Sequence, residues 1–386
     1  MLNISDHIGY IGVDDDNLEK FENQYPLLYG VSYNSYFIDD GRIAVVDSVD
    51  SRRCGQWLAE IEDALAGRTP DYIIVQHMEP DHSGSLRAFI ERYPQTRVVA
   101  TAKALSMILR FFEGLKFENI TVADGDTLEV GNTRLRFFTA PMVHWPEVMM
   151  TLDETDGVLF SADAFGTFSV FSTDCGWDSE ARRYYSNIVG KYGTSVQAVM
   201  KKLAGQKFSI VAPLHGPILT GNLARYWQLY DKWSRYEPET DGVLVAYASI
   251  YGGTEEAAHR LAAALRKHGV DEVVEMDLCR HDVSFAVAEA FRMGRMALCC
   301  STYDAGLFPP MQIFLNRMKS KGLRNRKVAL IENGSWAPVA GKLMRDALAE
   351  MKDMEVVDTT VTICSRMRDA DLPQIDSLAA ALADNN

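Results

Sequence analysis

The sequence predicts an α/β protein with two domains: two packed sheets with helices outside, followed by a doubly wound parallel sheet. Two observations lead to this prediction. Up to about residue 240, short strand patterns fill the middle of the segment and helical patterns lie toward its ends. Beyond that point strands and helices alternate regularly, which specifies parallel pairing. The run of residues 237–242 has a proline, three acids and a glycine, so we predict domains at 1–240 and 241–386.

The elements of the first domain follow from the spacing of apolar residues. A strand-turn-strand pattern spans residues 29–47 around Asp39-Asp40-Gly41, and a helix that ends at Gly67 follows. A buried strand comes next at residues 71–76, with a helix reaching Tyr93 and another strand at 97–101. Further short strands are predicted at residues 120–122, 127–130, 133–138, 148–152, 158–161 and 208–212, with helical stretches at about 180–203 and 222–236.

The second domain has a simpler predicted order. Its strands are expected at residues 243–248, 272–277, 296–300, 327–331 and 356–363, and its helices begin near residues 254, 283, 310, 341 and 371. In such a sheet, ligands bind outside the carboxyl ends of the strands.

Composition excludes several functional classes. The 386 residues are 47% hydrophobic and carry a net charge of −14, which argues against a nucleic-acid surface. No apolar run approaches the roughly 20 residues that span a bilayer, and no signal-peptide pattern begins the chain. We therefore expect a cytoplasmic protein that binds neither nucleic acid nor membrane. The six cysteines, Cys175 among them, form no C-x-x-C pair, which excludes an appended Cys-rich metal module; Cys299-Cys300 is interpreted as buried and reduced.

The densest cluster of metal-competent side chains is the run His77-Met78-Glu79-Pro80-Asp81-His82, directly after a predicted strand. A solvated polar turn is the alternative interpretation. Three more strand ends carry ligand-type residues, which favours a metal site. The complete candidate set is His77, Glu79, Asp81, His82, His144, Asp163 and His215. Imidazole and carboxylate without thiolate suit two adjacent ions of iron, manganese or zinc.

Three loops at strand ends of the second domain predict a flavin site. The sequence contains neither a G-x-x-x-x-G-K-[ST] loop nor G-x-G-x-x-G, so a monophosphate fits better than a triphosphate or dinucleotide. Hydroxyls and glycines of the first loop would present N–H groups to that phosphate, and Tyr251, Tyr303 and Trp336 are placed to flank a flat ring. We predict FMN, with an empty structural site as the alternative. The predicted cofactor-binding residues are Ser249, Ile250, Tyr251, Gly252, Gly253, Thr254, Ser301, Thr302, Tyr303, Asp304, Ala305, Gly306, Asn333, Gly334, Ser335 and Trp336.

This combination resembles the flavodiiron proteins, also called A-type flavoproteins. In that family an αββα metallo-β-lactamase-like domain precedes a flavodoxin-like domain. The resemblance extends from Tyr33-Asn34-Ser35-Tyr36 to the last helix, and its most specific element is His77-x-Glu79-x-Asp81-His82 followed by His144, Asp163 and His215. Lactamase-fold hydrolases commonly have a second histidine where this chain has Glu79.

The resemblance implies specific roles for the candidate ligands. One iron would be bound by His77, Glu79 and His144, the other by Asp81 and His215, and Asp163 would bridge them. His82 binds metal in some relatives and is replaced by water in others, so its role stays open. Some relatives also carry a histidine above the metal pocket where this chain has the segment 21–25, Phe-Glu-Asn-Gln-Tyr.

The implied function is an FMN- and diiron-dependent reductase of O2 to water, of NO to nitrous oxide, or of both. Electrons would come from an external donor: rubredoxin, a flavin reductase or a deazaflavin. A head-to-tail homodimer or tetramer would bring one chain's FMN to the partner's irons, with Trp145 either contacting that flavin or simply packing. Gas preference, donor and oligomer size stay open.

Two other functions are compatible with parts of the sequence. A zinc hydrolase with an accessory flavodoxin-like module fits the fold, but Glu79 and the three flavin loops count against it. An electron carrier that uses only the second domain would leave the seven metal-type residues unexplained.

Overall fold

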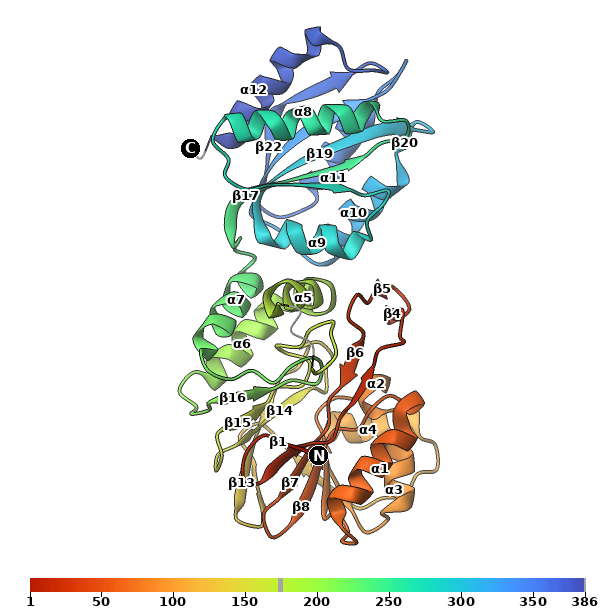
Figure 1. Cartoon of the computed structure of the whole chain (residues 1–386), viewed down its shortest axis with the longest axis vertical. Helices are drawn as coiled ribbons and strands as arrows, with labels where there is room; N and C mark the ends of the chain where they lie inside the picture. The colour runs from red at the N-terminus through yellow and green to blue at the C-terminus, as the bar shows by residue number, and fades with distance from the viewer. Residues whose placement is uncertain (173–175, 385–386) are drawn as a thin grey trace. The chain divides into compact units, whose positions relative to one another are not determined.

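The computed structural model describes residues 1–172 and 176–384, which lie in two compact units (Figure 1). Unit 1 comprises residues 1–185 and 194–231, and unit 2 comprises residues 186–193 and 232–386. The boundary between residues 240 and 241 stays a prediction about which segments fold as separate domains. Cys175 lies outside the described residues.

The first sheet of unit 1 has seven strands in the order β1-β2-β7-β8-β9-β10-β11. Strands β8 to β11 pair in parallel, and the strands before them pair antiparallel. Every residue of β8 and β9 is buried, as the continuous apolar runs predicted. The bounds are β1 Leu2–Asn3, β2 Ile8–Tyr10, β7 Tyr36–Asp39, β8 Ile43–Val46, β9 Tyr72–Val75, β10 Arg97–Thr101 and β11 Asn119–Val122.

A second sheet, β12-β13-β14-β15-β16, packs face to face on the first, because alternate residues of both sheets share one hydrophobic core. Val46 and Ile74 come to this core from the first sheet, and Phe137 and Phe160 from the second. The bounds are β12 Thr127–Val130, β13 Thr133–Thr139, β14 Met149–Asp153, β15 Val158–Phe160 and β16 Ile210–Ala212.

Helices cover the outer faces of unit 1. Figure 1 shows α1, α3 and α4 on the outer side of the first sheet, and α4 packs on β10 and β11. At the second sheet, Lys202 of α6 donates a hydrogen bond from Nζ to the Thr139 carbonyl at 2.7 Å. The αββα prediction is therefore confirmed. The helices are α1 Cys54–Leu65, α2 Pro80–Ser83, α3 Leu86–Arg92, α4 Ala102–Phe111, α5 Trp177–Tyr184, α6 Gly193–Leu203 and α7 Leu223–Arg235.

Two parts of this region differ from the sequence prediction. Residues 13–33 form small antiparallel ribbons, β3 (Val13–Asp15) with β6 (Val31–Tyr33) and β4 (Lys20–Phe21) with β5 (Tyr25–Pro26). Such two- and three-residue strands are too short to show periodicity. The predicted helical stretch 180–203 is interrupted by a π-helical turn at Tyr185–Val189 and a 3₁₀ turn at Gly190–Tyr192, where the chain enters unit 2.

Unit 2 contains a parallel sheet in the order β18-β17-β19-β21-β22. This 2-1-3-4-5 order is that of flavodoxin-like sheets, and the prediction of such a sheet is confirmed. Strand β19 runs through residues 301–303, which the sequence had placed in a loop, because its end pairs with β20. The bounds are β17 Thr240–Ala248, β18 Val273–Asp277, β19 Met293–Tyr303, β20 Gly306–Leu307, β21 Arg326–Asn333 and β22 Met354–Ile363.

Helices lie on both faces of this sheet (Figure 1). Apolar residues of α8 and α12, such as Leu261 and Leu378, share a core with Val245 and Ile331 of the sheet. Helices α9 and α10 pack together, and α11 packs on β21 and β22. The helices are α8 Gly253–Lys267, α9 Val283–Arg292, α10 Pro309–Ser320, α11 Ala340–Ala349 and α12 Leu372–Ala383.

Within the described residues, no helix has both the length and the apolar character needed to cross a membrane. The described cysteines are free thiols, and Cys299 and Cys300 are buried. Burial raises the pKa of Cys300 to about 12, so this thiol stays protonated.

Two buried arginines hold the carbonyl ends of helices in unit 2. Arg326 is 2% exposed and donates to the carbonyls of Ala290 and Phe291, in the last turn of α9, at 3.0 and 2.8 Å. It also donates to the Tyr236 carbonyl at 2.9 Å. Arg295 donates to the Ala383 carbonyl at the end of α12 at 2.8 Å. A planar guanidinium satisfies several orphan carbonyls at once.

We expect Arg326→Met to destabilise unit 2 by about 2–4 kcal/mol, because an apolar side chain of similar length leaves buried carbonyls unpaired. Hydrogen exchange measured by mass spectrometry should show faster exchange in α9. Arg260→Met, at an exposed position of α8, is the control and should change stability by less than about 0.5 kcal/mol. Equal exchange in both variants would contradict this role.

Candidate metal centre and cofactor cavity

The predicted metal ligands lie at strand ends on one edge of the sandwich. His77 follows β9, Asp163 follows β15 and His215 follows β16, while His144 lies between β13 and β14. Asp81 and His82 belong to α2, a single turn that begins with Pro80 at its first position. The predicted loop after β9 is therefore partly helical.

The structure gathers the seven side chains into two groups. The first metal group is His77, Glu79, His144 and Asp163, and the second is Asp81, His82 and His215. Within each group, one ligand atom from every member lies within 4.8 Å of those of the others. The resemblance implied the same division, except that it left the role of His82 open.

Asp163 lies between the two groups. Its Oδ2 is 3.2 Å from His77 Nε2 and 2.9 Å from His144 Nε2. Its Oδ1 is 3.2 Å from His82 Nε2 and 3.7 Å from His215 Nε2. The carboxylate thus presents one oxygen to each group, as a bridging ligand would.

These spacings fit a pair of metal ions. Two ligand atoms about 2.1 Å from one ion and at right angles to each other are about 3.0 Å apart. Among the described residues, the carboxylate oxygens of Asp81 and Asp163 are buried without a hydrogen-bond partner. Buried carboxylates in this condition need a cation, so the donor set fits two metals.

The backbone at His77 is held by two buried acids. Asp47 accepts hydrogen bonds from Gln76 N at 2.8 Å and His77 N at 3.3 Å. Burial raises the pKa of Asp47 to about 6, although His82 and these hydrogen bonds oppose that change. Glu147 accepts from His77 Nδ1 and from Met78 N, both at 2.9 Å. Because Nδ1 donates to Glu147, the lone pair of His77 is on Nε2, which faces Asp163.

The loop that carries His215 is held by Ser32 of β6 and by Asn34, which follows β6. His215 Nδ1 donates to the Ser32 carbonyl at 2.7 Å, which leaves Nε2 as the lone-pair nitrogen. Asn34 Nδ2 donates to the carbonyls of Pro213 and Gly216 at 2.7 and 2.9 Å. The strand expected here is therefore interrupted: β6 ends at Tyr33, β7 begins at Tyr36, and Asn34 between them fixes the neighbouring ligand loop.

Sequence reasoning missed Glu147 and Tyr184 as residues of this site. Glu147 comes three residues after His144, and that nearness was its only signal. Tyr184 is fully buried with its ring centroid 5.5 Å from that of His215, and among described residues its hydroxyl has no hydrogen-bond partner. Burial, and then Asp163, Asp81 and Glu79, raise the pKa of Tyr184, so its hydroxyl stays protonated.

The carboxylates of the two metal groups make the neighbouring imidazoles more basic. Burial lowers the pKa of His144, but the neighbouring carboxylates of Asp163 and Glu79 outweigh burial and raise it to about 9. Burial acts to raise the pKa of Asp163, but the neighbouring histidines together outweigh burial and lower it. Metal binding therefore has to displace imidazole protons.

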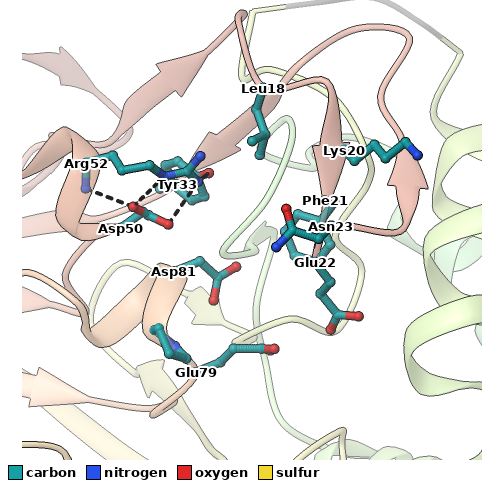
Figure 2. A pocket seen from close by; sticks show the side chains of 11 residues that line it. Leu18, Lys20, Phe21, Glu22, Asn23, Tyr33, Asp50, Arg52, Glu79 and Asp81 are labelled. Atoms are coloured by element: carbon teal, nitrogen blue, oxygen red, sulfur yellow. Dashed lines mark hydrogen bonds and ion pairs between the residues drawn. The ribbon is translucent and has the colours of Figure 1, made fainter.

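A pocket of about 420 Å³ opens beside both metal groups. Figure 2 shows Glu79 and Asp81 on one side of it and Phe21, Glu22 and Asn23 of the β4–β5 hairpin on the other. Burial, and then the neighbouring Glu79, raise the pKa of Glu22. The hairpin thus places the carboxylate of Glu22 in the segment 21–25, where some relatives have a histidine above the metal pocket.

Trp145 lies edge-on to a proposed ligand. Its ring centroid is 5.4 Å from that of His77, with the planes at 89°, and its side chain is half-buried. This placement is compatible with packing and with contact to a partner.

Unit 2 contains a second cavity, of about 450 Å³, at the carboxyl ends of β17, β19 and β21. Adjacent β17 and β19 form the switch point of the sheet. All predicted cofactor-binding residues line it except Gly252, which precedes α8, and Gly306, which pairs in β20; Ala337 and Ser365 also line it. Thr254 Oγ1 and Ser301 Oγ are hydrogen-bonded at 2.7 Å.

The cavity fits a phosphate and a flat ring. A Cβ on Gly253 would lie 2.7 Å from the Ser365 carbonyl oxygen, so the first loop needs glycine to pack this closely at the start of α8. Tyr251 and Trp336 are 98% and 92% exposed at the rim. Large aromatic side chains this exposed beside a cavity are available to stack on a ligand.

The chain is similar to several known proteins in sequence and in structure. A sequence model described as ODP family beta lactamase matches residues 31–216. The chain is 29% identical to the flavo-diiron protein FprA2 of Clostridium acetobutylicum, with 91% of each chain covered. It is 28% identical to the anaerobic nitric oxide reductase flavorubredoxin of Pectobacterium atrosepticum, which covers 87% of this chain and 68% of the relative. Rubredoxin oxygen:oxidoreductase from Desulfovibrio gigas superimposes with a TM-score of 0.93 at 25% identity, covering 99% of this chain and 97% of that one.

We expect Glu147→Gln to weaken metal binding at the first metal group by about 10–100-fold, because the amide no longer fixes the ligating tautomer of His77 as a carboxylate does. Competition with a chelator measures this affinity. Glu91→Gln, at an exposed acid paired with Arg87, is the control. Identical chelator curves for both variants would show that Glu147 does not support the metal.

Proposed function

The chain belongs to the flavodiiron protein family and is an oxidoreductase, and we propose that it reduces O2 to water, NO to nitrous oxide, or both, using FMN and two iron ions. The observation that carries this proposal is the position of Asp163, whose two oxygens face separate groups of imidazole and carboxylate ligands. The names of the relatives divide between oxygen and nitric oxide, so both gases stay in the proposal.

We assign His77, Glu79 and His144 to one iron, and Asp81, His82 and His215 to the other, with Asp163 shared. Two adjacent irons supply redox electrons and neighbouring binding positions for two small-molecule atoms. Glu79 favours iron over zinc, since it adds a hard oxygen donor to the imidazoles. All of these ligands except Glu79, which lines the pocket, are buried, so the protein limits water at the site and keeps each donor in one orientation.

The chain's other residues contribute positioning and hydrogen bonding. Asp47 and Glu147 hold His77, and Asn34 holds the His215 loop. Tyr184 keeps a neutral hydroxyl beside the second metal group. These contacts fix where a small molecule meets the ligands, which lowers the entropic cost of bringing two reacting atoms together.

We assign the unit 2 cavity to FMN. The Ser249–Thr254 loop and the start of α8 would bind the phosphate, and Tyr251, Tyr303 and Trp336 would flank the ring. FMN supplies storage of electrons and their release singly or in pairs. Electrons would come from an external donor such as rubredoxin, a flavin reductase or a deazaflavin.

We also propose a head-to-tail homodimer or tetramer in which FMN of one chain serves the irons of another. Trp145, half-buried beside His77, is the proposed contact to the partner's flavin.

Metal content tests the proposed function directly. Protein purified without added metal should contain about two irons per chain. His82→Ala should lower this to about one, because the variant removes one of three donors from the second metal group and none from the first. Mass spectrometry of the metal content measures both. Zinc at both positions, with no iron taken up from an iron-rich anaerobic preparation, would instead indicate a hydrolase.

The head-to-tail arrangement predicts complementation between two inactive chains. Asp163→Asn removes the shared metal ligand, and Gly253→Ala crowds the phosphate loop against Ser365. Each variant alone should lose gas reduction. Co-expressed with different tags and purified as a mixed oligomer, they should regain part of it, since FMN of one chain meets intact irons of the other. A mixed oligomer as inactive as its parents would contradict transfer between chains.

A further inference from the structure

A buried phenol lines the pocket beside the metal groups. Tyr33, the last residue of β6, is 1% exposed and lines the same pocket as Glu79 and Asp81. Its ring centroid is 6.3 Å from that of His215. A side chain buried this completely holds its hydroxyl in a fixed place.

Arg52 fixes the orientation of this hydroxyl. Its Nη2 donates to Tyr33 Oη at 2.9 Å, while its Nε and Nη2 donate to the two oxygens of Asp50 at 2.9 and 3.0 Å, as Figure 2 shows. Asp50 thus holds the Nε–Nη2 edge of the guanidinium, which leaves the second hydrogen of Nη2 for the phenol. A guanidinium has no acceptor. The Tyr33 oxygen must therefore accept in this contact, and its own hydrogen points elsewhere.

That hydrogen is available to the pocket. Among the described residues, none accepts a hydrogen bond from the Tyr33 hydroxyl. Burial and then Asp50 raise the pKa of Tyr33, Arg52 lowers it, and Asp81 and Asp15 raise it further. The net increase keeps the phenol neutral and protonated. Asp81, a member of the second metal group, is among the charges that act on it.

We propose that Tyr33 donates a hydrogen bond to small ligands held at the second metal group, and that Arg52 is the positioning residue for this donor. The inference rests on the proposed function, because the ligands in question are O2, NO or anions that imitate them. It adds a hydrogen-bonding residue from β6 that the metal motif does not contain.

Azide binding tests the proposal without turnover. The probe is azide, titrated into the iron-loaded, oxidised protein with FMN bound and followed by the azide-to-iron charge-transfer absorption as a difference spectrum. Tyr33→Phe, which removes only the hydroxyl, should weaken azide binding about tenfold, the effect of losing one hydrogen bond to a charged ligand. Tyr93→Phe is the matched control, because Arg92 donates to Tyr93 Oη at 3.4 Å in an exposed pair outside the pocket; it should leave the affinity unchanged.

A double-mutant cycle separates positioning from simple charge attraction. Arg52→Gln should weaken azide binding about threefold or more when Tyr33 is present, and have no further effect when combined with Tyr33→Phe. Arg52→Lys keeps the charge and one donor, and should restore part of the loss. An equal effect of Arg52→Gln with and without the phenol would overturn the positioning role, since Arg52 would then act on azide directly.

The outcomes distinguish this inference from the function on which it rests. Azide affinity that is unchanged in Tyr33→Phe overturns the inference and leaves the diiron proposal intact. Loss of iron from Tyr33→Phe also overturns it, because the hydroxyl would then support the site rather than a ligand. If the iron-loaded wild-type protein binds no azide, both the inference and the proposed metal chemistry are wrong.

Discussion

The constraint on which unit 1 depends is the burial of Asp163 among four imidazoles. Its carboxylate is 1% exposed, and its oxygens lie 2.9–3.7 Å from the Nε2 atoms of the surrounding histidines. Burying such a charge in a protein interior costs several kcal/mol unless cations compensate it. Two divalent ions held by the surrounding imidazoles would supply this compensation. The edge of the sandwich is therefore built to hold positive charge.

This constraint explains why the residues around the ligands are polar although they are buried. A histidine offers a lone pair on Nε2 only when its Nδ1 carries the hydrogen. Glu147 sets this state for His77, and the Ser32 carbonyl sets it for His215. Asn34 then fixes the loop behind His215 through two backbone carbonyls. Glu147 and the segment that contains Ser32 and Asn34 are both far in sequence from the ligands they support, so the site requires the αββα scaffold.

The ligands and the residues that support them differ in how far the sequence predicts them. The ligand types and the flavin loops are predictable, because both occur directly after apolar strand patterns and such strand ends meet at one edge of a sheet. The partners of the ligands are not predictable in this way. His77 and Glu147 are 70 residues apart, and Asn34 and Pro213 are 179 apart, so only the folded sheets bring them together. The hairpin β4–β5 escapes prediction for another reason: two-residue strands have no periodicity, yet this hairpin forms one wall of the pocket.

His82 illustrates how geometry adds to a motif. The sequence left open whether it binds metal. In the structure its Nε2 is 3.0 Å from the Nε2 of His215, and its Nδ1 has no hydrogen-bond partner among the described residues. The His215 Nε2 is a lone-pair nitrogen, because its Nδ1 donates to the Ser32 carbonyl. Two imidazole lone pairs at this distance repel each other unless a proton or a metal ion lies between them. A shared proton would satisfy only the two nitrogens. Asp81 Oδ2 also lies 3.3–3.4 Å from both nitrogens, and Asp163 Oδ1 lies nearby. The two nitrogens and two carboxylate oxygens are four metal-donor atoms that face one point. They favour a metal ion there, with His82 as one of its ligands.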